Sequence, residues 1–134
     1  MPENQSIKFS LLITANPISS EKASTAYQFC EAALISGHQV CGVFFYLDGV
    51  LTANNLISPA SDEVNLTTRW AALAEQYKIP LEVCVSAALR RGIVNQEEAK
   101  QLARFNYNLK PPFVLSGLGQ LAELSSRCDR LVQF

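Results

Sequence analysis

Charge, histidine and paired cysteines are all scarce in this sequence, and each shortage argues against a class of protein. Only 17% of the 134 residues are charged, and 11 Lys and Arg against 12 Asp and Glu give a net charge of −1. This balance argues against binding to nucleic acid through a broad basic surface. His38 is the one histidine, and the 4 cysteines contain no C-x-x-C pair. A zinc site, a Ser/His/Asp triad and a secreted disulfide framework are therefore disfavoured, and we expect reduced thiols, no metal and no cofactor.

Long hydrophobic runs are also missing. The apolar run from Phe9 to Ala15 contains Ser10 and Thr14, so it is too short and too mixed for a membrane span or a signal peptide. We interpret it as a buried strand of a cytoplasmic protein. The charged fraction lies below the roughly 25% of ordinary soluble domains, which predicts that a partner covers some apolar surface. A strongly apolar parallel sheet would account for part of the same excess.

The sequence does contain a regular alternation of short apolar runs with amphipathic stretches. Strands are predicted at 7–14, 40–46, 81–85, 113–115 and 130–134. Helices are predicted between the polar turn 16–20 and Gly37, and at 66–77, 86–91, 96–104 and 117–126, with Asn95 as one cap. This order predicts an α/β fold: a single domain, 1–134, with a five-stranded parallel sheet, helices on both faces and flavodoxin-like layering.

One connection, from Leu47 to Glu63, is long for a compact domain. Connections of this length are more often functional or interfacial than idle. We interpret it as a wall or partner surface beside the neighbouring sheet edge, or as a structural loop that forms an oligomer contact. Asp62 and Glu63 either meet a basic partner or cap the helix that follows.

The position of each cysteine in the predicted fold indicates which of the four thiols could be functional and which are core residues. Functional groups of open α/β sheets gather beyond the carboxyl ends of the strands. Cys30 lies on an apolar helix stripe and Cys41 early in a strand, so we expect both to be buried core residues. Cys128 precedes the last strand, at the opposite end of the sheet. Cys84 ends a strand just before a helix start near Ser86, and this pattern fits a reactive thiol and a core residue equally well.

Other polar features carry weaker signals. Arg90 and Arg91 lie too far along a helix to activate Cys84 directly, and we expect them to cap its end or meet an acidic partner. The stretch Ser116–Gly119 resembles half of a phosphate-binding turn, and tight strand-to-helix packing explains it better. His38 is interpreted as a loop residue.

Several segments together resemble a known family, and they are distributed from the second predicted strand to the last residue. They are Phe44-Phe45-Tyr46, Gly49-Val50, Ala53-Asn54, 58–63, 84–92, 116–119 and 128–134. This pattern is similar to the DsrE/DsrF-like family, in particular to the DsrE-type subunits of TusBCD-type sulfurtransferase complexes. The resemblance implies a DsrE-like fold and sulfurtransferase activity.

The resemblance also decides between the two interpretations of Cys84, because this residue matches the cysteine that carries sulfur as a persulfide in the family. Ser86 stands where we expect alanine in close relatives, and the loop 16–22 matches less well. We expect a helix start at Cys84 to favour release of sulfur more than its capture, since it stabilises a departing thiolate.

By the same resemblance, the partners are TusB-like and TusC-like subunits in a heterohexamer, a TusA-like sulfur donor and a TusE-like acceptor. The end product is 2-thiouridine at tRNA wobble positions, with no direct binding of tRNA by this chain. Alternatives are an assembly subunit whose Cys84 is structural, a sulfur relay in dissimilatory sulfur oxidation, and a nucleotide-binding flavodoxin-like module.

Overall fold

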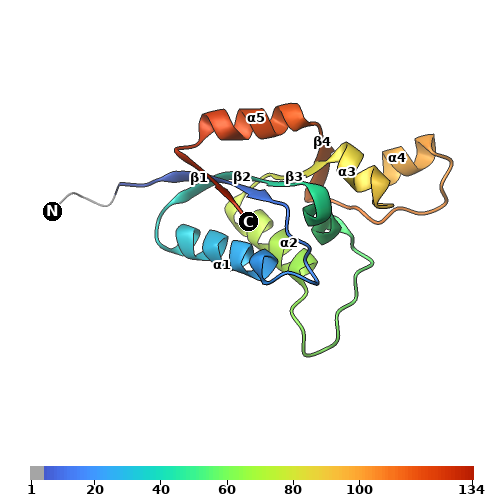
Figure 1. Cartoon of the computed structure of the whole chain (residues 1–134), viewed down its shortest axis with the longest axis horizontal. Helices are drawn as coiled ribbons and strands as arrows, with labels where there is room; N and C mark the ends of the chain where they lie inside the picture. Colours follow the sequence, from blue (N-terminus) through green and yellow to red (C-terminus); the bar gives the residue numbers. More distant parts are fainter. Residues whose placement is uncertain (1–4) are drawn as a thin grey trace.

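The short apolar runs form one sheet in the computed structural model, which describes residues 5–134 (Figure 1). Its five strands lie in the order β4-β3-β2-β1-β5, and every adjacent pair is parallel. The strands are β1 (Lys8–Ile13), β2 (Gln39–Phe45), β3 (Leu81–Cys84), β4 (Phe113–Ser116) and β5 (Arg130–Gln133). The predicted α/β fold with a five-stranded parallel sheet is confirmed.

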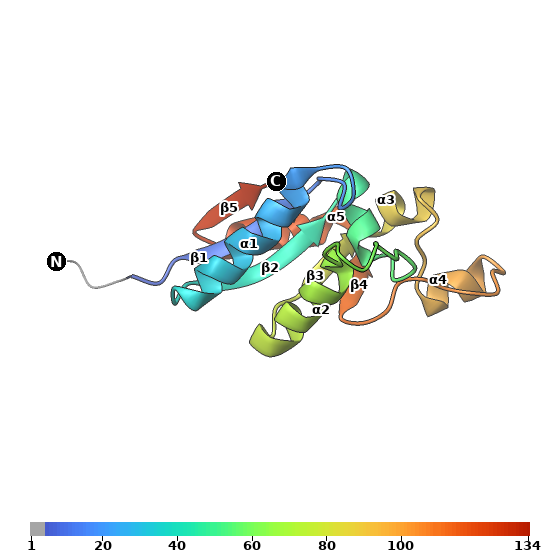
Figure 2. The same cartoon turned by 90° about the horizontal axis from the view of Figure 1, so that it is seen from below.

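Helices cover both faces of the sheet, as predicted. α1 (Glu21–Ile35) and α2 (Leu66–Tyr77) lie side by side on one face, and α5 (Leu118–Arg127) lies on the other (Figures 1 and 2). An aromatic cluster joins α1, α2 and β2, because the Trp70 ring meets Tyr27 and Phe45 edge to face, with centroids 5.2 and 5.7 Å apart. Edge-to-face pairs of this kind add to the free energy of burial, so they fix both helices against the sheet.

The residue that caps α2 is Asn65, and not Asp62 or Glu63 as one of the two predictions had it. The Asn65 side chain accepts a hydrogen bond from the Thr68 amide at 3.2 Å and caps the helix, whereas a Glu63 carboxylate oxygen accepts from the Ala60 amide at 3.0 Å. The capping role of Asp62 and Glu63 is therefore wrong. Asparagine is a preferred cap, and it stands directly before the first helical residue.

The connection that follows β2 is also more ordered than predicted. Its first half, Leu47–Ala53, forms a 3₁₀ helix, η1, and only residues 54–65 remain irregular. Gly49 allows η1 to approach β1 closely, since a Cβ atom there would collide with the Ile13 carbonyl oxygen. This close approach positions η1 beside the carboxyl ends of the central strands.

Two short helices, α3 (Val85–Arg90) and α4 (Gln96–Gln101), lie at one end of the molecule next to the edge strand β4 (Figure 2). Asn95 caps α4 as predicted, but the helix ends before the predicted residue 104. Ala103 adopts a left-handed conformation with φ of 55°, and the Arg104 amide donates to the Ala99 carbonyl at 2.7 Å. This pattern is a Schellman motif, which ends a helix even without glycine.

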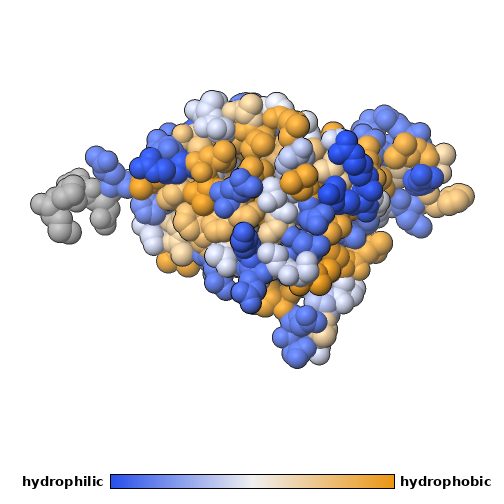
Figure 3. All heavy atoms as spheres, viewed as in Figure 1, coloured by the Kyte–Doolittle hydropathy of each residue, from blue (hydrophilic) through white to orange (hydrophobic). Residues whose placement is uncertain are grey.

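The surface retains large apolar side chains. Figure 3 shows apolar residues interspersed with polar ones over one face of the molecule. Ile18, Leu56 and Phe105 are 72%, 70% and 102% exposed. Within residues 5–134, no helix has both the length and the apolar character needed to cross a bilayer.

Candidate functional site

Cys84 lies where β3 passes into α3, at the carboxyl end of the sheet. It is the last residue of β3 and the N-cap of α3, with extended backbone angles of φ −60° and ψ 119°. The helix begins at Val85, one residue earlier than the predicted start at Ser86, which brings the thiol directly onto the helix start. The residue is only 1% exposed, and its sulfur lies 3.5 Å from the Ser86 hydroxyl oxygen.

The neighbouring strand brings a second polar side chain to this end of the sheet. In the register of β3 with β4, Cys84 pairs with Ser116 and Val83 with Leu115. Directly paired residues of adjacent strands point to the same face. The Ser116 hydroxyl oxygen is buried, and it has no hydrogen-bond partner within the described part of the chain. Sequence patterns did not bring Ser116 next to Cys84, since strand register is a long-range property.

The electrostatic surroundings of Cys84 come from two helix starts. α3 follows β3 and α5 follows β4, and neither helix has an acidic residue in its first turn. Gly117 is the N-cap of α5, but a Cβ atom on Gly117 or Gly119 would meet no heavy atom within 4 Å, so the predicted tight strand-to-helix packing at these glycines is wrong. The positive ends of both helix dipoles thus point toward the end of the sheet at which Cys84 lies.

η1 and the end of α3 form one wall of this region. η1 packs against β3 and α3. The Arg91 guanidinium donates to an Asp48 carboxylate oxygen and to the Ala87 carbonyl, both at 3.0 Å. Arg91 therefore caps the carboxyl end of α3 and meets an acidic residue of η1, in agreement with its predicted role. The first half of the predicted wall, Leu47–Ala53, is next to the site.

The second half of that connection borders a different feature. A groove of about 360 Å³ lies between it and the start of α1, and its lining includes Pro17, Ile18, Pro59 and Val64. Val64 is 52% exposed. The connection is thus divided between a wall beside Cys84 and an open apolar groove.

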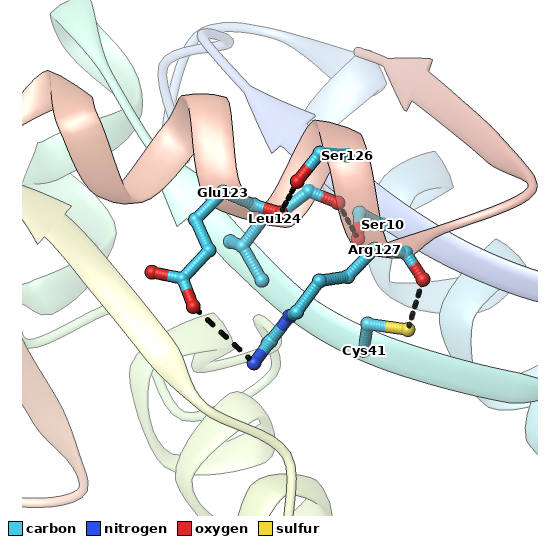
Figure 4. Close-up of polar contacts among 6 residues, drawn as sticks. All are labelled: Ser10, Cys41, Glu123, Leu124, Ser126 and Arg127. Atoms are coloured by element: carbon cyan, nitrogen blue, oxygen red, sulfur yellow. Dashed lines mark hydrogen bonds and ion pairs between the residues drawn. The ribbon is translucent and has the colours of Figure 1, made fainter.

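Cys41 departs from the predicted core position. A register shift leaves Cys41 unpaired between Val40 and Gly42, and the residue is half-buried. Its thiol donates to the Arg127 carbonyl oxygen at 3.8 Å, while the nearby Ser10 hydroxyl donates to the Leu124 carbonyl at 3.0 Å (Figure 4). The expectation of a fully buried Cys41 is wrong, because a bulge turns the side chain toward the end of α5.

Cys128 and His38 lie away from Cys84. Cys128 ends α5 at the amino-terminal side of β5, and its thiol donates to the Ser125 carbonyl at 3.5 Å. His38 lies between α1 and β2, where its Nδ1 accepts from the Ile7 amide at 3.1 Å. Both positions agree with the predictions, and neither residue joins the site.

Cys30 is fully buried in α1, as predicted, and its thiol supplies a test of the core. Desolvation, with a smaller contribution from Glu31, raises its pKa from 9.0 to about 12. Above pH 9.0 the Cys30 thiol loses its proton in the unfolded chain, whereas in the folded chain it keeps the proton up to about pH 12. The free energy of unfolding therefore falls as the pH rises from 9.0 towards 12.

We expect the wild type to lose about 1.4 kcal/mol per pH unit relative to Cys30→Ala over this window. Urea denaturation of both proteins from about pH 8 to about pH 11 measures the difference. Parallel pH dependences of the two proteins would show that the Cys30 thiol ionises as readily in the folded chain as in the unfolded one.

Comparisons with known proteins agree with this architecture. The model of the DsrE/DsrF-like family matches residues 8–134. Sulfurtransferase TusD of Klebsiella pneumoniae (strain 342) is 48% identical over 128 residues, covering 96% of this chain and 100% of that protein. Sulfurtransferase TusD of Yersinia pestis (strain Pestoides F) is 51% identical over 128 residues, covering 96% and 98%.

A solved structure shares the fold at much lower identity. The crystal structure of the ychN protein from E. coli aligns with a TM-score of 0.75 and 16% identity, and the alignment covers 96% of this chain and 99% of that one. At this identity the likeness concerns the fold alone. The family match and the two relatives confirm the resemblance found in the sequence, and the chain belongs to the DsrE/DsrF-like family.

Proposed function

We propose that this protein is a sulfur-relay subunit that carries a transferable sulfur atom as a persulfide on Cys84. The reaction class is sulfur transfer, as in the curated relatives at 48% and 51% identity. The observation that carries the choice of residue is the position of Cys84 at the junction of β3 and α3. The other three cysteines lie in the core of α1, in the β2 bulge and at the opposite end of the sheet.

The proposed chemistry needs one cysteine. The Cys84 thiolate attacks the outer sulfur of a donor persulfide, one S–S bond forms as another breaks, and the donor leaves as a thiolate. An acceptor thiolate then attacks the outer sulfur on Cys84, and Cys84 leaves as a thiolate. Each step exchanges one sulfur–sulfur bond for another, so no external oxidant or reductant is required. The helix starts near Cys84 favour the second step, since they stabilise the departing thiolate.

Burial of Cys84 shapes how partners reach it. At 1% exposure, the thiol is protected from stray oxidants and thiols. A donor or acceptor therefore gains access only when the segments around the junction shift, and binding of the correct partner supplies the free energy for that shift. η1, held to α3 by the Asp48–Arg91 ion pair, is the segment next to the site. This arrangement favours transfer between docked proteins over reaction with small thiols.

We further propose a heterohexamer with TusB-like and TusC-like subunits, located in the cytoplasm. The donor is a TusA-like carrier and the acceptor is a TusE-like protein, and the sulfur ends in 2-thiouridine at tRNA wobble positions without direct tRNA binding by this chain. Exposed Ile18, Leu56 and Phe105 support assembly, because large apolar side chains at 72%, 70% and 102% exposure are typical of interfaces.

The burial of Cys84 also favours a second candidate function, an assembly subunit whose cysteine is a core residue and whose partners carry the sulfur. The two proposals differ in where sulfur resides. We would incubate the chain, with and without its partner subunits, with a cysteine desulfurase, a TusA-like carrier and sulfur-labelled cysteine, and then locate the label by peptide mass spectrometry.

The carrier proposal requires label on the peptide that contains Cys84, and a reductant must remove it. Label on another subunit, with none on this chain, would establish the assembly role instead.

A further inference from the structure

We propose that Ser116 is a second residue of the sulfur site, and that its hydroxyl donates a hydrogen bond to the outer sulfur of a persulfide on Cys84. The inference rests on the proposed carrier function. It assigns a binding role to a residue that sequence patterns placed in a packing turn. The carrier role of Cys84 does not by itself require this hydroxyl.

The first observation is the unpaired hydroxyl itself. Across residues 5–134, Ser116 Oγ is the buried side-chain oxygen or nitrogen that finds no hydrogen-bond partner. The buried Ser10 hydroxyl, by contrast, donates to the Leu124 carbonyl at 3.0 Å. Native proteins pair nearly all buried polar groups, and an exception is explained by strain, by a bound water molecule or by a functional role. A hydroxyl kept unpaired retains a free donor for a group that arrives during the reaction.

The second observation is the strand register. Ser116 is the direct partner of Cys84 across the parallel pair β3–β4, with both side chains on the same face. In the thiol form the two side chains make no hydrogen bond, since Ser116 Oγ finds no partner within residues 5–134. A persulfide extends the Cys84 side chain by one S–S bond of about 2.05 Å, which brings an acceptor atom within reach of a hydroxyl on the next strand.

The two serines near Cys84 therefore have different partners. Ser86 Oγ lies 3.5 Å from Cys84 Sγ, next to the inner sulfur. Ser116, on the other strand, is placed for the outer sulfur. An ionised persulfide is a charged acceptor, which strengthens the bond that the Ser116 hydroxyl donates.

This hydrogen bond changes the sulfur exchange in a defined direction. A donor persulfide and the Cys84 thiolate give a donor thiolate and the Cys84 persulfide, with one S–S bond formed and one broken. The Ser116 hydroxyl gains a partner only on the product side. It therefore shifts the equilibrium toward loaded Cys84, offsetting the release that the helix starts favour.

The test compares Ser116→Ala, Ser116→Thr and a matched control, Ser126→Ala, in the full chain. Ser126 lies in α5, and its exposed hydroxyl donates to the Glu123 carbonyl at 2.9 Å. Each protein is equilibrated with a persulfide-loaded TusA-like carrier in an excess of the unloaded carrier. Iodoacetamide in denaturing buffer then traps thiols and persulfides, and peptide mass spectrometry gives the ratio of persulfide to thiol at Cys84.

We expect Ser116→Ala to lower this ratio about tenfold, the size expected for one hydrogen bond to a charged sulfur. Ser116→Thr retains the hydroxyl and the wild-type ratio, as does Ser126→Ala. The pH profile of the persulfide-to-thiol ratio must also move to higher pH by about one unit in Ser116→Ala, because loss of the donor disfavours the ionised form. A packing role of Ser116 would leave that profile in place.

The outcomes separate this inference from the carrier proposal. Equal loading of wild type and Ser116→Ala would overturn the role of Ser116 and leave Cys84 as a carrier. Equal losses in the alanine and threonine variants would also overturn it, since the hydroxyl would then be irrelevant. A wild-type chain that takes no sulfur on Cys84 would overturn both proposals.

Discussion

Replacing Cys84 by serine is expected to abolish sulfur transfer by this chain, with a rate at least about a thousandfold lower, because the hydroxyl supplies no thiolate to attack or leave. The variant should fold normally. Cys84 is the N-cap of α3, a position at which serine is strongly preferred. The measurement is the rate of transfer from a TusA-like donor to a TusE-like acceptor in the reconstituted complex.

Cys128→Ser is the matched control for this experiment. The Cys128 thiol donates to the Ser125 carbonyl at 3.5 Å, and a serine hydroxyl can make the same bond at the opposite end of the sheet. Its transfer rate should remain within about twofold of the wild type, as expected for a surface substitution away from the site. Undiminished transfer by Cys84→Ser would contradict the carrier role directly.

Gly49→Ala is expected to be the most destabilising small substitution, lowering the free energy of unfolding by roughly 3 kcal/mol. The added Cβ atom would collide with the Ile13 carbonyl oxygen, and that oxygen already accepts a hydrogen bond from the Tyr46 amide at 2.9 Å. Neither backbone segment can move without loss of pairing between β1 and β2. For a chain of this length, the melting temperature should fall by about 10 °C in a thermal denaturation followed by circular dichroism.

Gly119→Ala provides the comparison, because the same Cβ atom there meets no heavy atom within 4 Å. It lies in the first turn of α5, where alanine has the higher helix propensity, so its stability should equal or exceed that of the wild type by up to about 1 kcal/mol. Similar melting temperatures for both variants would mean that η1 does not need glycine to approach β1.

Local sequence patterns predicted most of the fold. Strand and helix positions follow from periodicity, and residues such as Ser20 and Asn95 cap helices where their side chains suggested. The failures have physical causes outside local patterns. The bulge that exposes part of Cys41 arises from the register between β1 and β2, and the order of η1 depends on packing against β1 and β3.

The candidate site was predictable in part. The position of Cys84 at a strand end followed from the pattern, and the family resemblance favoured it over the core interpretation. The pairing of Ser116 with Cys84 was not predictable, because it joins strands separated by α3, α4 and a long loop. The burial of Cys84 to 1% exposure also depends on packing from η1 and α3, which no single segment encodes.

A single-turnover chase tests the central claim most directly. The chain is loaded with labelled sulfur, freed of donor and mixed with a TusE-like acceptor, and label is followed on both proteins. We predict that label leaves the Cys84 peptide at the same rate at which it appears on the acceptor. If label appears on the acceptor while the Cys84 peptide retains all of its label, the account is contradicted, since the sulfur on Cys84 is then not the sulfur that is transferred.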